Sequence, residues 1–189
     1  ELDERLDGQL SALLSAEGFR GKLSQRVSIT PLGRLPYRRL VIMGSGQRKE
    51  SAPWVAACRA EPDPIRLKRI AFAIMNMARQ WKVHRLGVVF ASVREPDQVL
   101  ERLAEFLQQA AYRFDKHKLP PAESYPKLVQ VRFVEPTRYS PSALERGQII
   151  GQECNTARQL VNLSPAHLHP KAFVERIREQ AAPLNLQIT

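Results

Sequence analysis

Leucines spaced three or four residues apart begin the chain and predict an amphipathic helix. They are Leu2, Leu6, Leu10, Leu13 and Leu14. Gly18 and Gly21 are expected to end this helix. Two β-favouring runs follow, Arg26–Ile29 and Arg39–Met43, and the turn between them is rich in proline and glycine.

The longest apolar period of the chain follows Pro62 and predicts a long helix. Asp63 is a suitable N-cap and Pro64 fits the first helical position. The expected apolar face consists of Ile65, Ile70, Ile74, Met77, Ala78 and Trp81. A strand is predicted next, over Leu86–Phe90.

A second long helix is predicted from Pro96, with continuation into residues 112–118 before Pro120. Its expected core stripe is Val99, Leu100, Leu103, Phe106, Leu107 and Ala110. A further strand is predicted over Leu128–Val134. Strands that alternate with helices of this length indicate an α/β fold, with a sheet covered by helices on both faces.

The last fifty residues differ from the rest. A helix is predicted from Ser140–Pro141 to about Leu163, with Ser142 and Glu145 as a capping box. Another helix should begin at Pro170 and end near Pro183. Leu184–Thr189 favours a strand, and we expect the sheet of that strand to belong to sequence not present. The first residue is Glu1 rather than Met, which also favours a fragment.

Composition narrows the class of protein. The 189 residues are 43% apolar and 25% charged, which excludes a wholly disordered chain. No run of about 18 apolar residues is present, so no membrane span is expected. The N-terminus lacks the pattern of a signal peptide. Cys58 and Cys154 match no metal-finger or disulfide pattern, and we interpret both as reduced thiols in a cytoplasmic protein.

The net charge is unusually high, at +10, because the chain has 29 basic and 19 acidic residues. Residues 1–60 contribute +4, residues 61–139 contribute +5 and residues 140–189 contribute +1. A basic domain attracts nucleic acid through its phosphates. The positive charges occur singly or in pairs, so a solubilising surface is the favoured interpretation, and DNA remains an alternative partner.

The residues that could form a catalytic, metal or phosphate site are only weakly supported by their sequence context. His167 and His169 are flanked by prolines and lack a nearby third metal ligand, so a capping or turn role is favoured. His84 and His117 are isolated. The run Gly44–Gly46 after a strand could hold a phosphate, although a tight turn explains it more simply. Trp54 and Trp81 are interpreted as packing anchors rather than base-stacking platforms.

Two segments resemble the leucyl aminopeptidase (cytosol aminopeptidase) family. The first is Ala111–Lys118, which reads A-Y-R-F-D-K-H-K, and the second is Asn155–Pro165, which reads N-T-A-R-Q-L-V-N-L-S-P. Members of the family carry similar phrases in the same order, with a linking helix and then a proline that starts the next helix. The turn at residues 164–169 departs from the family pattern, which usually has a second proline and an asparagine.

The resemblance implies a macro-domain-like mixed sheet with helices on both faces over residues 1–138, followed by a long linker helix. The linker would span residues 139–163, and residues 164–189 would begin a C-terminal peptidase domain. Nucleotide or ADP-ribose binding by the macro-like domain is a further alternative. By the same resemblance, the longer protein would be a homohexamer that removes N-terminal amino acids from peptides.

Two divalent metal ions, zinc or manganese, would then be bound in the catalytic domain, whose carboxylate-rich signature this chain lacks. After Ser140 the acids are Glu145, Glu153, Glu175 and Glu179. Their helical positions favour solvated faces over metal ligands. We therefore assign no catalytic, cofactor-binding or metal-ligating residue, and we expect the chain alone to be inactive as a peptidase.

Overall fold

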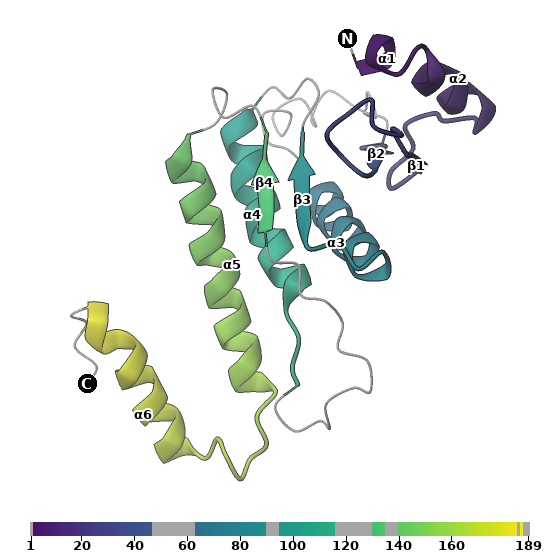
Figure 1. Cartoon of the computed structure of the whole chain (residues 1–189). Helices are drawn as coiled ribbons and strands as arrows, with labels where there is room; N and C mark the ends of the chain where they lie inside the picture. Colours follow the sequence, from purple (N-terminus) through teal and green to yellow (C-terminus); the bar gives the residue numbers. More distant parts are fainter. Residues whose placement is uncertain are drawn as a thin grey trace, which may run out of the picture.

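The computed structural model describes residues 2–46, 63–89, 95–115, 130–134, 140–184 and 186. Helices and short strands make up this part of the chain, and they alternate from α3 to α5 (Figure 1). The elements in chain order are α1 (Leu2–Arg5), α2 (Gln9–Ala16), β1 (Arg26–Ile29), β2 (Leu40–Met43), α3 (Pro64–Gln80), β3 (Arg85–Val88), α4 (Pro96–Ala111), β4 (Gln130–Phe133), α5 (Pro141–Val161), α6 (Pro170–Ala181) and the 3₁₀ turn η3 (Ala182–Leu184).

The predicted N-terminal helix is two helices, so the expectation of a single one was wrong. The break lies at Asp7 and Gly8, whose φ angles of 52° and 76° are left-handed and cannot continue an α-helix. The side chain of Leu6, just before the break, is fully buried. Hydrogen bonds from the side chain and backbone of Ser11 tie Asp3 of α1 to α2, and they hold the pKa of the Asp3 carboxyl below its usual value.

Strands β1 and β2 form an antiparallel hairpin, which confirms both predicted strands. The register pairs Arg26 with Met43 and Ile29 with Leu40. Strand β2 begins one residue later than predicted and is half-buried along its length. The hairpin and α2 lie on the side of the molecule opposite α6 (Figure 1).

Strands β3 and β4 pair in parallel, with Arg85 opposite Gln130. Strand β4 lies within the predicted Leu128–Val134, while β3 begins one residue before the predicted Leu86–Phe90 and ends at Val88. Phe90 and residues 128–129 fall outside the described part. The apolar side chains of the two strands pack against α3 and α4, while Arg85 and Arg132 on the other face are exposed. One antiparallel and one parallel pair, with the helices around them, give the mixed α/β class that was predicted.

The core lies between α3 and α4. The N-cap of α3 is as predicted, because the Asp63 carboxylate accepts the backbone N–H of Ile65 at 3.0 Å. The predicted apolar face was partly wrong: Ile65 is 66% exposed. Leu67, Ala71 and Met75 are buried in its place.

The predicted stripe of α4 is buried in full. The predicted continuation of α4 was wrong over residues 112–115, since Tyr112 is already extended with a ψ of 136°, and residues 116–118 lie outside the described part. The chain therefore leaves the helix at Ala111, and Tyr112 to Asp115 follow as an irregular segment.

Helices α5 and α6 begin at the predicted prolines. The predicted capping box was wrong, because Ser140 is the N-cap and its side chain pairs with the Ser142 hydroxyl at 2.6 Å. The carboxylate of Asp97 instead accepts the backbone N–H of Ser140 at 2.7 Å. The predicted terminal strand was wrong at Leu184, which lies in η3, and residues 185 and 187–189 fall outside the described part.

Candidate functional site

Small residues seat α5 directly on the backbone of α4. Ala143, Gly147 and Gly151 recur at intervals of four residues and are all buried. A methyl group on Gly147 would lie 2.2 Å from the carbonyl oxygen of Glu101. One on Gly151 would lie 2.6 Å from Cβ of Gln108. Side chains at these positions would push the helices apart, so both glycines are required by the close approach.

The C-terminal end of α4 is capped by side chains of α5. The last four carbonyls of a helix lack intrahelical partners. The Asn155 amide donates to the Gln108 carbonyl at 2.9 Å, and the Arg158 guanidinium donates to the Gln109 carbonyl at 2.9 Å. A cation at a helix C-terminus also interacts favourably with the helix dipole.

Helix α3 supplies a third cap to the same helix end. The guanidinium of Arg79 donates to the carbonyl of Ala110 at 2.6 Å. Three of the last four carbonyls of α4 therefore accept side-chain hydrogen bonds from two different helices. We call Arg79, Asn155 and Arg158 the α4 clasp.

Tyr112 joins the two sequence segments that carry the family resemblance. The guanidinium of Arg158 lies 4.2 Å from the centre of the Tyr112 ring, a cation–π contact. The side-chain amide of Asn162 and the Tyr112 hydroxyl are 3.1 Å apart. The two segments are therefore parts of one packed junction, although about forty residues separate them in the sequence.

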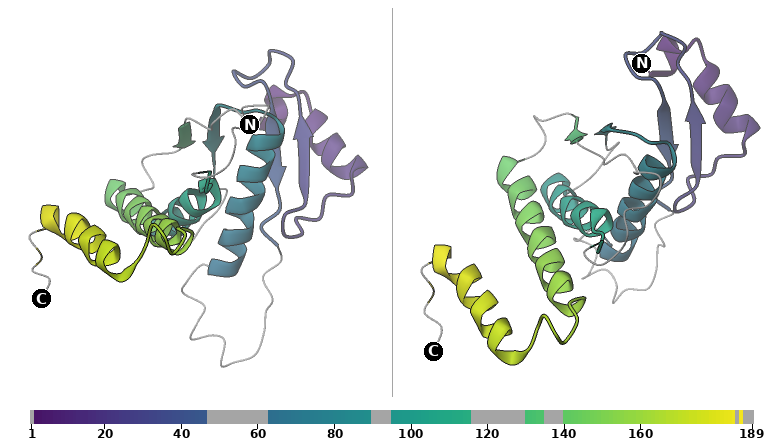
Figure 2. Two further views of the ribbon diagram at one scale, coloured as in Figure 1. Left: turned by 90° about the horizontal axis from the view of Figure 1, so that it is seen from below. Right: turned by 60° about the horizontal axis from the view of Figure 1, so that its bottom comes forward.

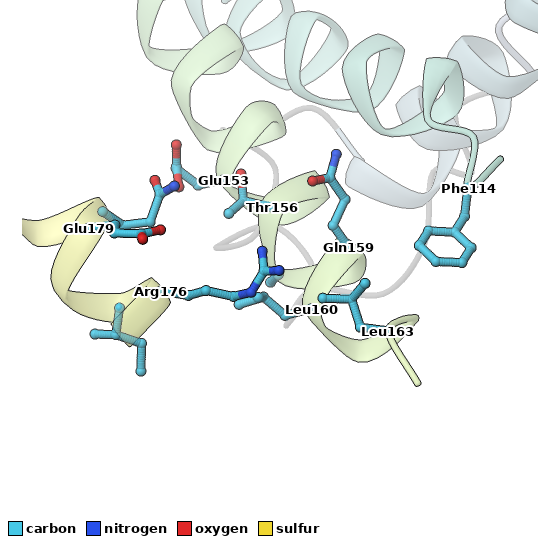
Figure 3. Close-up of a pocket in the computed structure, with 11 residues that line it drawn as sticks. Phe114, Glu153, Thr156, Gln159, Leu160, Leu163, Arg176 and Glu179 are labelled. Carbon is cyan, nitrogen blue, oxygen red and sulfur yellow. The ribbon is translucent and has the colours of Figure 1, made fainter. Parts of the chain in front are cut away.

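A groove of about 300 Å³ separates α5 from α6 beyond this junction (Figure 3). Glu153 and Thr156 line it from α5, and Arg176 and Glu179 line it from α6. The complete lining is Phe114, Glu153, Thr156, Ala157, Gln159, Leu160, Leu163, Arg176, Ile177, Glu179 and Gln180. No hydrogen bond or ion pair between described residues links α5 to α6 across it.

The histidines before α6 have structural partners. His167 Nδ1 and the Ser164 hydroxyl are 2.8 Å apart, which closes the turn. His169 is the N-cap of α6, and its Nδ1 accepts the backbone N–H of Ala172 at 3.3 Å. These contacts confirm the predicted turn and capping roles.

Among residues that the structure describes, no three His, Cys, Asp or Glu side chains gather where they could hold a metal ion. The four glutamates after Ser140 are exposed on their helices. Cys154 is a free, half-buried thiol, while Cys58 and His117 lie outside the described residues. The described residues therefore do not form a metal centre.

The run Gly44–Gly46 pairs with residues 21–25 beyond the end of β2, rather than forming the predicted tight turn. The backbone N–H of Gly44 donates to the Gln25 carbonyl at 2.7 Å, and that of Gly46 donates to the Gly21 carbonyl at 2.9 Å. A methyl group on Gly44 would lie 2.3 Å from the carbonyl oxygen of Lys22. Because two of the three amides are already used, the run is poorly suited to hold a phosphate.

Among the described residues, Trp81 and His84 belong to no cluster of reactive groups. Trp81 is half-buried, and the guanidinium of Arg39 lies 4.3 Å from its ring centre, so it anchors the hairpin to α3. His84 is exposed. Trp54 lies outside the described residues.

Sequence reasoning quoted Asn155, Arg158 and Asn162 but did not foresee their contacts, and it missed Arg79. The four-residue spacing of Ala143, Gly147 and Gly151 was an available signal for close helix packing. The partners of Arg79 and Arg158 are backbone carbonyls, which every sequence contains. No residue pattern could therefore have identified them.

Comparison with known proteins identifies the class. The model of the cytosol aminopeptidase family, N-terminal domain, matches residues 1–121. The chain belongs to this family.

A probable cytosol aminopeptidase of Roseiflexus castenholzii is 30% identical over 193 residues, which cover 99% of this chain and 37% of that protein. A probable cytosol aminopeptidase of Alkaliphilus oremlandii is 26% identical, and the match covers 100% of this chain and 37% of that protein. The chain thus spans little more than a third of the curated relatives that it matches.

Solved structures show the same fold. A tomato leucine aminopeptidase mutant superposes with a TM-score of 0.68 at 20% identity, covering 96% of this chain and 34% of that one. The bottromycin maturation enzyme BotP in complex with Mn gives a TM-score of 0.68 at 21% identity, covering 93% of this chain and 34% of that one. No described helix is both long and apolar enough to cross a membrane.

Proposed function

We propose that residues 1–189 are the N-terminal portion of a longer, metal-dependent aminopeptidase that removes N-terminal amino acids from peptides in the cytoplasm. The observation that carries this proposal is the family match over residues 1–121, together with relatives of which the chain covers only 37%. Catalysis and two divalent metal ions, zinc or manganese, would reside in the remainder of such a protein. This portion would contribute a folded body and the start of the connection, within a homohexamer.

The proposed organisation is an N-terminal macro-like domain over residues 1–138, a linker helix over residues 139–163 and the start of a peptidase domain over residues 164–189. Its support is the contrast between α5, which is seated on α4, and α6, which faces an open groove. In this arrangement the α4 clasp fixes the direction in which α5 leaves the first domain. The clasp residues would therefore position a following domain without touching substrate.

The mass of the native polypeptide tests this proposal. An antibody raised against residues 1–189 should detect a band more than twice the 21.5 kDa of this chain in the source cells. The immunoprecipitated protein should hydrolyse a leucine anilide and lose that activity on metal chelation. The recombinant 189-residue chain, as the matched control, should be inactive. A native band at 21.5 kDa without peptidase activity contradicts the proposal.

A second candidate function is nucleic-acid binding by the N-terminal domain, and it is compatible with the first. The observation that favours it is the separation of charge within residues 2–46, where residues 18–46 contain basic but no acidic side chains. Affinity for duplex DNA that falls steeply with salt tests this function. Absence of binding at low ionic strength contradicts it.

A further inference from the structure

The hairpin unit, defined as residues 18–46, concentrates positive charge. Its six basic side chains are all exposed: Arg20, Lys22, Arg26, Arg34, Arg38 and Arg39. The preceding segment, residues 2–17, carries one basic and four acidic side chains. The unit itself contains no carboxylate, and among the described residues one of its six cations, Arg34, is paired with a carboxylate from outside it, that of Asp7.

The hairpin tip, defined as residues 30–39, exposes apolar side chains among these charges. Leu32 is 86% exposed and Tyr37 is 54% exposed. Leu32 has a φ of 48°, a left-handed conformation that branched and bulky residues rarely adopt. Leu35 is 5% exposed and anchors the loop, while the backbone N–H of Arg34 donates to the Pro31 carbonyl at 3.0 Å. The turn is thus held in a shape that presents Leu32 to solvent.

The three tip arginines differ in how they are held. The guanidinium of Arg39 lies on the Trp81 ring, and Arg34 is paired with the carboxylate of Asp7. Within the part of the chain that the structure describes, Arg38 makes no hydrogen bond or ion pair. Arg38 directly follows the exposed Tyr37 and is itself exposed, so its guanidinium can reach an external anion.

We propose that the hairpin tip binds duplex nucleic acid, with Leu32 entering the minor groove and Arg38 contacting a flanking phosphate. This rests on the second candidate function and assigns its site. Minor-groove proteins combine arginines with apolar wedge residues such as leucine and proline. Guanidinium groups match phosphate oxygens in a two-pronged geometry.

An anionic membrane is the competing polyanion, and the tip suits it less well. Membrane-surface binding scales with the apolar area that enters the lipid and typically uses a whole amphipathic face. The tip offers one leucine and one tyrosine among three arginines. In addition, the hairpin lies on the opposite side of the molecule from α6, so a bound duplex would leave the α5–α6 region accessible (Figure 2).

The test is fluorescence anisotropy of the whole chain with a short labelled duplex, at salt concentrations between about 50 and 200 mM. Arg38→Gln should lower the slope of log K against log salt by about 1, because one phosphate contact is lost. Leu32→Asn should weaken binding about threefold or more with an unchanged slope, because it removes apolar contact but no charge. Asparagine tolerates a positive φ, so this variant should retain its fold, as checked by circular dichroism.

Lys68→Gln is the matched control, since it removes one exposed charge from α3, more than ten residues from the Trp81 end that the tip contacts. It should leave both affinity and slope unchanged. Duplex binding that neither tip variant alters overturns this site but leaves nucleic-acid binding standing, whereas no binding by the unmodified chain overturns both. Equal affinity for the single strand, or tip-dependent binding to phosphatidylserine vesicles without duplex binding, also overturns the proposal.

Discussion

The two faces of α5 are built in opposite ways. Towards α4, glycines bring the backbones together and the clasp caps the carbonyls of the neighbouring helix. Towards α6 lies an open groove, and α6 itself exposes Phe173 and Val174 at about 40% each. The contrast shows that the face of α5 towards α4 is covered by residues of this chain. The region towards α6 exposes apolar surface, of the kind that another protein surface usually covers.

The largest expected effect is at the α4 face. Gly147→Ala should destabilise the chain by about 3 kcal/mol, because its methyl group meets the backbone of α4 and the helices must separate. Urea denaturation measures this change. Gly87→Ala is the control, since its methyl group would lie 3.7 Å from the nearest side chain, an ordinary contact. Equal stability of the two variants would show that the close packing of α5 is unimportant.

The clasp should give an intermediate effect. Arg158→Ala removes the hydrogen bond to the Gln109 carbonyl and the contact with the Tyr112 ring, and should cost about 1 to 2 kcal/mol. Thermal unfolding measures this loss. Arg178→Ala on α6 removes an exposed arginine from the other region and should change stability by less than about 0.5 kcal/mol. A loss as large for Arg178 as for Arg158 would erase the contrast between the two faces.

The smallest effect is expected in the groove. Ile177→Ala should cost about 1 kcal/mol or less in this chain, below the loss for a fully buried isoleucine, because Ile177 is only half-buried beside an open space. The same denaturation series measures it. A cost of about 3 kcal/mol would mean that α5 and α6 form a closed core, contrary to this account.

Sequence pattern was sufficient where a local rule decides the structure. Asp63 and Pro64 fix the start of α3 through a side-chain cap and a restrained backbone angle. The stripe of α4 was found because all of its members are buried apolar residues at helical spacing. The break at Asp7 was missed, since the leucine spacing around it remains helical while the backbone does not.

The junction could be predicted only in part, for a different physical reason. The segments around Tyr112 and Asn155 were recognisable as phrases of one family, which the family match confirms for the chain. Their contact depends on how α4 and α5 pack, and that distance is set by the glycines. The direction of the Arg158 side chain then follows from packing rather than from neighbouring sequence.

The central claim is that α5 is stabilised by this chain and α6 is not, and amide hydrogen exchange of the dilute monomer tests it most directly. Amides of α5 near Gly147 and Gly151 should exchange only through global unfolding, while those of α6 should exchange through local opening and at least about tenfold faster. Protection of α6 equal to that of α5 would contradict the account.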